Sequence, residues 1–134
     1  MINKLDAEFR FHQNALSLRA ERQQLLASNI ANADTPGFKA RDIDFRSALA
    51  GALAAAPAAA PVAATHRQHL PVPAVHATAG QPLYRMPRQD SIDGNSVELD
   101  AERAQFADNA LRYEASLSAV NGKIKNLLSV IQGN

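Results

Sequence analysis

Few residues of this sequence have a type and spacing that suit chemistry, and the most suggestive pair is His66 and His69. Two histidines at this spacing can bind zinc when cysteine, histidine or carboxylate ligands lie nearby. The sequence has no cysteine, and it has no acidic residue between Ser47 and Tyr84. We therefore expect a solvated histidine pair, and we predict no metal-binding or cofactor-binding residue.

Paired carboxylates can serve in acid–base catalysis, and the chain offers Asp42 with Asp44 and Asp90 with Asp93. The first pair lies where a helix is expected to begin, and the second flanks an expected turn, so capping and turn formation explain both pairs. The sequence contains no Gly-rich phosphate loop, serine-elbow motif or His-Glu-x-x-His motif. We predict no catalytic residue and no enzymatic activity.

The stretch Leu25–Phe45 organises the chain, because a long helical pattern runs into it and stops. Asn32 suits the helix end, since asparagine tolerates left-handed φ values and bonds the local backbone. Pro36 and Gly37 suit the central positions of a type II turn, with positive φ at the glycine. The residues expected to shape this motif are Asn29, Asn32, Thr35, Pro36, Gly37 and Phe38.

Residues 1–33 are predicted to form one helix whose large apolar residues fall on two stripes. One stripe consists of Leu5, Phe9, Leu16, Leu26 and Ile30, and the other of Phe11, Leu18 and Leu25. Two stripes indicate either burial between neighbours in one bundle or two different packing partners. We expect Leu5, Phe9, Leu16 and Ile30 to face the C-terminal helix, and Phe11, Leu18 and Leu25 to face neighbouring subunits.

Residues 34–50 contain the turn, a short extended segment and the start of a short helix. We expect Asp42 or Asp44 to cap this helix, with Phe45, Leu49 and Leu53 along one side.

Residues 51–92 are predicted to be a flexible, largely disordered linker, because alanines that favour helix alternate with prolines that interrupt it. Six of the seven prolines fall between Pro57 and Pro87. The segment Leu70–Val75 is a candidate edge strand.

Residues 93–134 are predicted to form a C-terminal coiled-coil helix after an Asp-Gly turn. Asn95 or Ser96 is the expected N-cap, and Glu98 has capping-box spacing from Asn95. Apolar residues then recur in steps of four and three, which is typical of a coiled-coil seam. The seam consists of Phe106, Ala110, Tyr113, Leu117, Val120, Ile124, Leu127 and Ile131.

Together these elements predict a mainly α fold in which the two long terminal helices form a coiled-coil hairpin. Aromatic residues make up 5% of the chain and tryptophan is absent, so we expect a weakly ordered monomer that assembly stabilises. Basic and acidic residues are interspersed and the net charge is +1, which argues against a nucleic-acid partner. The sequence shows neither a membrane span nor a cleavable Sec-type signal.

The segment Ser28–Lys39, SNIANADTPGFK, resembles the N-terminal signature of bacterial flagellar rod and hook axial proteins. That signature reads Asn-Ile/Leu-Ala-Asn-x-x-Thr-Pro-Gly-aromatic. The segments Arg19–Gln23, Ala40–Phe45, Asp93–Asp100 and Asn109–Tyr113 are also similar to a rod member of this family. Phe38 stands where tyrosine is common, and the Ala/Pro tract matches nothing specific in the family.

The resemblance implies a structural proximal rod subunit of the bacterial flagellar basal body, which polymerises helically into the drive shaft that transmits torque for motility. It implies type III export without a cleaved signal peptide and a place in the periplasmic rod. The implied partners are other copies of the chain, FlgC and other rod proteins, the FliE adaptor, the MS ring and the export apparatus. It implies no small-molecule substrate. A cytoplasmic coiled-coil adaptor or export chaperone is the alternative, because the same helices would serve in a soluble complex.

Overall fold

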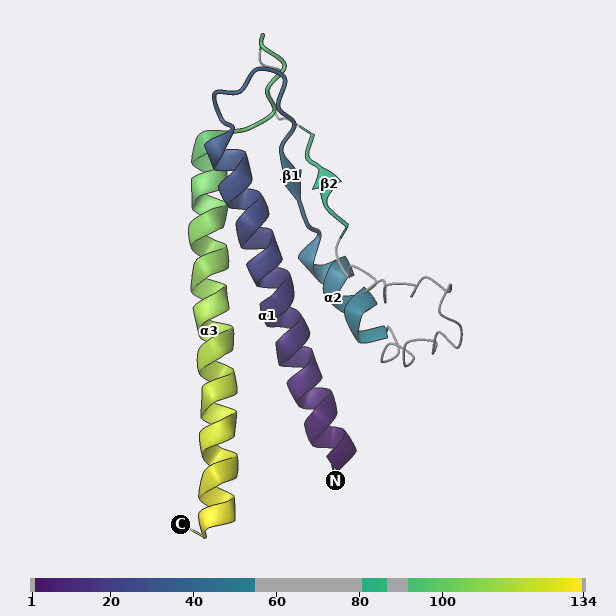
Figure 1. The fold of residues 1–134 in the computed structure, drawn as a ribbon, viewed down its shortest axis with the longest axis vertical. Coiled ribbons are helices and arrows are strands. Elements are labelled where there is room, and N and C mark those ends of the chain that lie inside the picture. The colour runs from purple at the N-terminus through teal and green to yellow at the C-terminus, as the bar shows by residue number, and fades with distance from the viewer. Residues whose placement is uncertain (1, 55–80, 87–91, 134) are drawn as a thin grey trace, which may run out of the picture.

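The computed structural model describes residues 2–54, 81–86 and 92–133, which form three helices and a two-stranded ribbon. The long helices α1 (Ile2–Ala31) and α3 (Leu99–Gln132) lie side by side and run in opposite directions (Figure 1). The short helix α2 (Phe45–Ala54) packs against α1. The described part is therefore mainly helical, with long helices at both ends, as the sequence predicted.

Helix α1 ends at Ala31, two residues before the predicted boundary at residue 33. The backbone N–H of Asn32 donates to the carbonyls of Ser28 and Asn29, both at 3.1 Å, so the last turn tightens before Pro36. The Asn32 side chain donates to the Ser28 carbonyl at 2.8 Å. Asn32 does not adopt the left-handed φ that we expected, because its amide caps the helix from an ordinary backbone conformation.

A tight turn follows, closed by the N–H of Phe38, which donates to the carbonyl of Thr35 at 3.2 Å. Gly37 has φ +72°, as predicted for this position. The chain then extends into β1 (Arg41–Asp42), which pairs antiparallel with β2 (Leu83–Tyr84).

Helix α2 begins at Phe45, and Asp44 is its N-cap. The Asp44 carboxylate accepts hydrogen bonds from the N–H groups of Arg46 (3.2 Å) and Ser47 (3.3 Å). Phe45 and Leu49 pack against the core, whereas Leu53 is 42% exposed.

The predicted linker of residues 51–92 differs from the structure at both ends. Residues 51–54 continue α2, because no proline lies between Phe45 and Ala54, and Leu83–Tyr84 forms β2. Residues 55–80 and 87–91 lie outside the described residues, and with them the candidate strand Leu70–Val75, His66, His69 and Asp90.

Helix α3 begins at Leu99, later than predicted, and its N-cap residue Glu98 makes no side-chain capping hydrogen bond. Asn95 and Ser96 are therefore not the N-cap of this helix. At the other end Gly133 has φ +73°, and its N–H donates to the Ser129 carbonyl at 3.1 Å.

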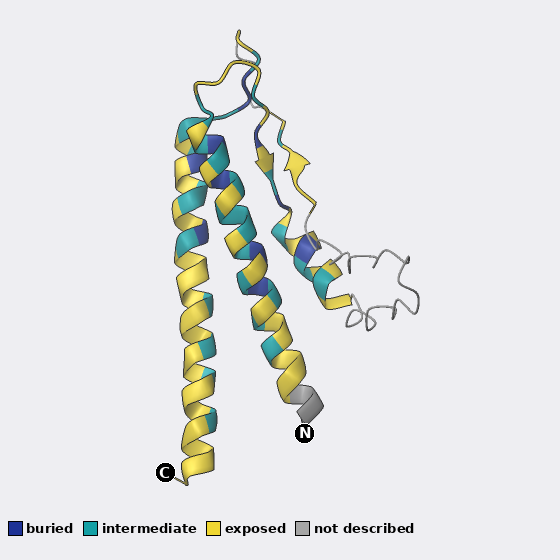
Figure 2. Cartoon of the chain, viewed as in Figure 1, coloured by how far each residue is buried: buried dark blue, intermediate teal, exposed yellow. Residues whose placement is uncertain are grey.

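The buried residues extend from the end of the molecule where the loops join α1 and α3 to the middle of α1, where α2 packs (Figure 2). A small core contains Leu18, Ile43 and Ala48, and Leu26 is also fully buried. The C-terminal half of α3 is largely exposed. No helix in the described ranges has the length and apolar character that crossing a bilayer requires.

Candidate functional site

Several hydrogen bonds hold the junction where residues 32–40 meet residues 93–98. Asn95 lies at its centre and is 6% exposed. Its amide group donates to the carbonyls of Asn32 (3.1 Å), Ala33 (2.6 Å) and Thr35 (3.0 Å). These three carbonyls lie in the turn directly after α1, so Asn95 holds that turn from a distant part of the chain.

The two junction segments are also joined along their backbones. Gly37 donates its N–H to the carbonyl of Asp93 at 2.9 Å, and Ser96 donates its N–H to the carbonyl of Phe38 at 3.0 Å. The Ser96 hydroxyl accepts the N–H of Ala40 at 2.8 Å. The turn after α1 is thus held by the segment that leads into α3.

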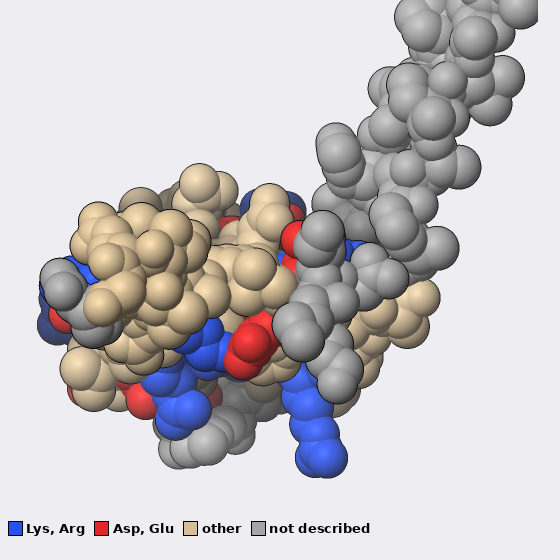
Figure 3. All heavy atoms as spheres, turned by 90° about the horizontal axis from the view of Figure 1, so that it is seen from below, with Lys and Arg blue, Asp and Glu red and all other residues tan. Residues whose placement is uncertain are grey.

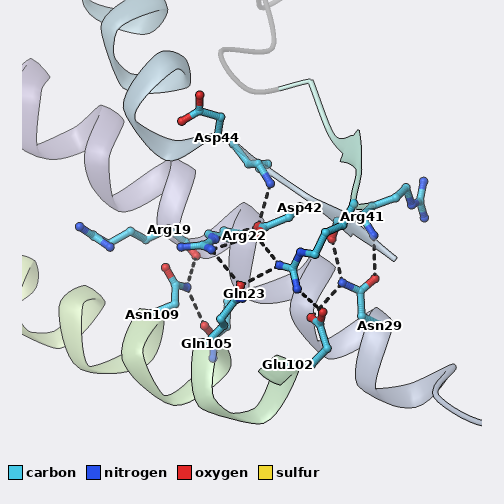
Figure 4. A network of polar contacts seen from close by, with 12 residues as sticks. Arg19, Arg22, Gln23, Asn29, Arg41, Asp42, Asp44, Glu102, Gln105 and Asn109 are labelled. Carbon is cyan, nitrogen blue, oxygen red and sulfur yellow. Dashed lines mark hydrogen bonds and ion pairs between the residues drawn. The ribbon is translucent and has the colours of Figure 1, made fainter. Parts of the chain in front are cut away.

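Asn29, the first asparagine of the predicted motif, is 1% exposed and uses its whole amide. Its side chain accepts the N–H of Arg41 at 3.1 Å and donates to the carbonyl of the same residue at 2.8 Å. It also donates to the Glu102 carboxylate at 3.0 Å. Asn29 therefore fixes β1 against the start of α3 (Figure 4).

An ionic network surrounds Asp42 and Glu102. Arg22 donates to both oxygens of Asp42, at 2.8 and 2.9 Å, in a bidentate pair. Arg85 donates to Asp42 at 2.6 Å and to Gln105 at 2.7 Å, and it forms an ion pair with Glu102. The side chain of Glu102 is 1% exposed. Arg85 therefore ties the segment after β2 to both β1 and α3.

The charged groups in this network shift each other's pKa values. Burial raises the pKa of Asp42, but hydrogen bonds from Arg22 and Arg85 and from the N–H of Ile43 outweigh it, so the pKa lies below its ordinary value. The hydrogen bond to Asp42 raises the pKa of Arg22 despite the burial of Arg22. Both groups are thus held in their charged forms.

Polar contacts continue along the pair of long helices. Asn109, which is 1% exposed, donates to the carbonyl of Arg19 at 2.8 Å and to the side chain of Gln23 at 2.6 Å. Gln23 donates to the carbonyl of Phe106 at 3.4 Å. These contacts set the register of α1 against α3.

Sequence reasoning missed this network, although one signal was available. Glu102 and Asn109 fall between Leu99, Phe106 and Tyr113 at steps of three and four, so polar residues occupy possible seam positions. A buried polar residue at such a position needs a partner. Nothing in the sequence around Arg85 indicated that it would be the partner of Glu102.

The predicted packing residues differ widely in exposure. Phe9, Leu16, Ile30, Phe106, Ala110, Val120 and Leu127 are half-buried. Leu5, Tyr113, Leu117, Ile124 and Ile131 are 36–80% exposed. One partner helix covers only one side of a seam, so these side chains keep accessible apolar surface.

The predicted subunit-contact residues divide into two groups. Leu18 is 3% exposed within the core beside Ile43, and Leu25 packs against the same cluster. These two residues are therefore covered within the chain by β1 and α2, contrary to our expectation. Phe11 is 42% exposed, and its ring makes an edge contact with His12 at 5.3 Å.

The described residues offer no arrangement for catalysis. Asp42 is neutralised by arginines, Asp44 caps α2, and the Thr35 hydroxyl donates to the Asn32 side chain at 3.2 Å. No group of three or more potential metal ligands occurs in these ranges. On the face seen in Figure 3, basic and acidic side chains are interspersed among uncharged ones. The arrangement positions backbone and helices.

The family model and the similar proteins all point to flagellar rod proteins. The family described as flagella basal body rod protein matches residues 9–39. The flagellar basal body rod protein FlgB of Escherichia coli K12 is 52% identical over 135 residues, which cover 98% of each chain. FlgB of Salmonella typhimurium is 48% identical over 99% of each chain, and FlgB of Aeromonas hydrophila is 44% identical over 99% of this chain and 98% of its own.

Identity of this extent over nearly the full length exceeds what a shared helical pattern would produce. The family match covers most of α1 and the turn that Gly37 makes. The chain therefore belongs to the flagellar basal body rod proteins of the FlgB type, which are structural components of the basal body and not enzymes.

Proposed function

We propose that this chain polymerises with its own copies into the proximal part of the rod, the drive shaft that transmits torque for motility. The observation that carries the proposal is the apolar surface left open on α3. Leu128, Val130 and Ile131 are 49%, 79% and 80% exposed. Exposed apolar residues in this number are typical of a surface that another protein covers.

The two long helices would act as a coiled-coil hairpin in that assembly. Antiparallel packing of α1 and α3 supports this proposal, as does the predicted seam, which is only half-covered in the single chain. The motif residues Asn29, Asn32, Thr35, Pro36, Gly37 and Phe38 would then shape a rigid hairpin end. The backbones of Asn32, Thr35, Gly37 and Phe38 bond across the junction, and Asn29 bonds β1 and α3.

The proposed partners follow the family. They are other rod proteins such as FlgC, the FliE adaptor and the MS ring at the flagellar base. The chain would reach them in the periplasm through the type III export apparatus, without a cleaved signal peptide. Residues Phe11 and Leu53, both 42% exposed, add apolar surface on α1 and α2 for such contacts.

A complementation experiment tests the proposal. A tagged copy is expressed in a bacterium that lacks its own FlgB, and basal bodies are purified. We expect motility to return and the tag to appear in the basal bodies. A tag retained in a soluble cytoplasmic complex, with no recovery of motility, would instead support the adaptor or export chaperone.

A matched pair of α3 variants sharpens this test. Val130→Asp places a charge on the exposed apolar surface, whereas Ser118→Asp places the same charge on an exposed polar position. We expect Val130→Asp to fold but to be missing from basal bodies, and Ser118→Asp to assemble. Equal assembly of both variants would contradict a role for this surface.

A further inference from the structure

Among the described residues, Arg19 is an arginine beside the polar network whose buried Nε has no hydrogen-bond partner. Its guanidinium lies over the ring of Phe45, 4.3 Å from the ring centroid. Its Nε is buried and donates to no acceptor. Among the described residues no carboxylate forms an ion pair with it, whereas Arg22, one turn further along α1, is paired with Asp42. Figure 4 shows Arg19 pointing away from the network around Asp42.

The surroundings of Arg19 are positively charged. Burial, and then the nearby charges of Arg112 and Arg22, lower the pKa of Arg19. Asp108 is the acid that opposes them, but it already pairs with Arg112 at 2.8 Å. A buried donor among like charges is costly unless an anion meets it. This position therefore lacks one negative charge.

The chain carries a suitable carboxylate on its opposite flank. Glu114 follows Arg112 by two residues, which is about 200° around a helix. It is exposed, forms no ion pair within the described residues, and borders a groove of about 300 Å³. The same groove is lined by Gln23, Ala110 and Tyr113. The two flanks of the helix pair thus carry complementary charges.

We propose that Glu114 of a second copy of this chain binds Arg19 and Arg112, so that copies associate head to tail. A contact between two different flanks is heterologous and can repeat along a polymer. The proposal rests on the proposed function, because it assigns one contact of that self-assembly. It also explains why Arg19 is unpaired in the single chain.

Self-association of the full chain tests the proposal, measured by sedimentation velocity over a range of concentrations. We expect Arg19→Gln and Glu114→Gln each to raise the dissociation constant about tenfold or more, since each removes one partner of an interfacial ion pair. The double variant should be no weaker than the weaker single variant, because both remove the same interaction. Arg103→Gln and Asp6→Asn, which remove exposed charges elsewhere, are the matched controls.

Charge reversal gives a readout that a folding defect cannot imitate. Arg19→Glu and Glu114→Arg should each fail to form oligomers alone. An equimolar mixture should associate again, because Glu114 of one variant meets Arg19 of the other and the swapped contact also joins opposite charges. Circular dichroism checks that each variant folds, and Arg19→Gln remains a milder test if Arg19→Glu does not.

The stability of the isolated chain provides an independent measurement. Because Arg19 lacks an anion in the single chain, Arg19→Met should leave the Tm of dilute protein unchanged or raise it while association weakens. A lower Tm would show that Arg19 stabilises the monomer and would overturn the proposal.

Each remaining outcome has a clear meaning. If the wild-type chain does not self-associate, both the proposed self-assembly and this contact are wrong. If it associates but the Arg19 and Glu114 variants behave like their controls, only the contact is wrong. Weakened single variants that form no mixed oligomers would also exclude the Arg19–Glu114 pairing.

Discussion

Replacing Arg85 with alanine tests whether the ionic network holds the fold together. Arg85 is the cation paired with Glu102, whose side chain is 1% exposed. Removing one partner of a buried ion pair typically costs about 3–5 kcal/mol. The Arg85 side chain is 25% exposed, and Glu102 keeps its hydrogen bond from Asn29, so we expect a loss at the lower end, about 3 kcal/mol.

Urea unfolding followed by far-UV circular dichroism measures this loss of unfolding free energy. Arg112→Ala is the control, because its pair with Asp108 is 61% and 52% exposed and should contribute less than about 0.5 kcal/mol. Adding Glu102→Gln to Arg85→Ala should recover part of the loss, since it removes the uncompensated charge. A loss for Arg85→Ala no larger than that for Arg112→Ala would refute the reasoning.

Three further predictions concern the turn, acid stability and assembly. Gly37→Ala should cost about 1–2 kcal/mol and reduce swimming, because φ is +72° there although the added methyl group has open space. Gly122→Ala, in helix α3 with equal space, should instead stabilise by about 0.5–1 kcal/mol, and normal swimming of the Gly37 variant would contradict the role of the turn. The pKa of Asp42 is lowered in the folded chain, so the ionised carboxylate stabilises the fold fully above its ordinary pKa of about 3.9. This stabilisation disappears as the pH falls through the lower pKa of the folded state. Asp42→Asn should therefore remove this contribution to the acid sensitivity of the Tm, measured in melts over a range of pH. Circular dichroism of the dilute chain should show helix content that rises with concentration, and a concentration-independent cooperative melt would contradict a monomer stabilised by assembly.

The sequence alone was sufficient to predict the elements that depend on interactions between residues close together in the chain. The periodic apolar residues of α1 and α3, the stop before Pro36 and the positive φ of Gly37 all follow from side-chain and backbone preferences over a few residues. Asp44 as the cap of α2 follows for the same reason. The residues of the SNIANADTPGF segment also indicated the family that full-length comparison then showed.

Tertiary structure decided which partner each polar residue takes. Asn95 has the sequence features of an N-cap for the helix that follows it, yet it binds the turn after α1, 60 or more residues earlier in the chain. Leu18 and Leu25 resemble a free stripe, yet β1 and α2 cover them. Arg85 reaches Glu102 only because the ribbon returns the chain to the start of α3.

The physical reason is the range of the interactions. Helix propensity, capping and turn geometry depend on neighbours along the chain, so sequence alone determined the long helices and the turn between Asn32 and Phe38. A buried carboxylate or amide is stable wherever the fold supplies a partner, and many polar residues are equivalent partners in the sequence. Only the folded chain therefore decided that Asn29, Arg85 and Glu102 would meet.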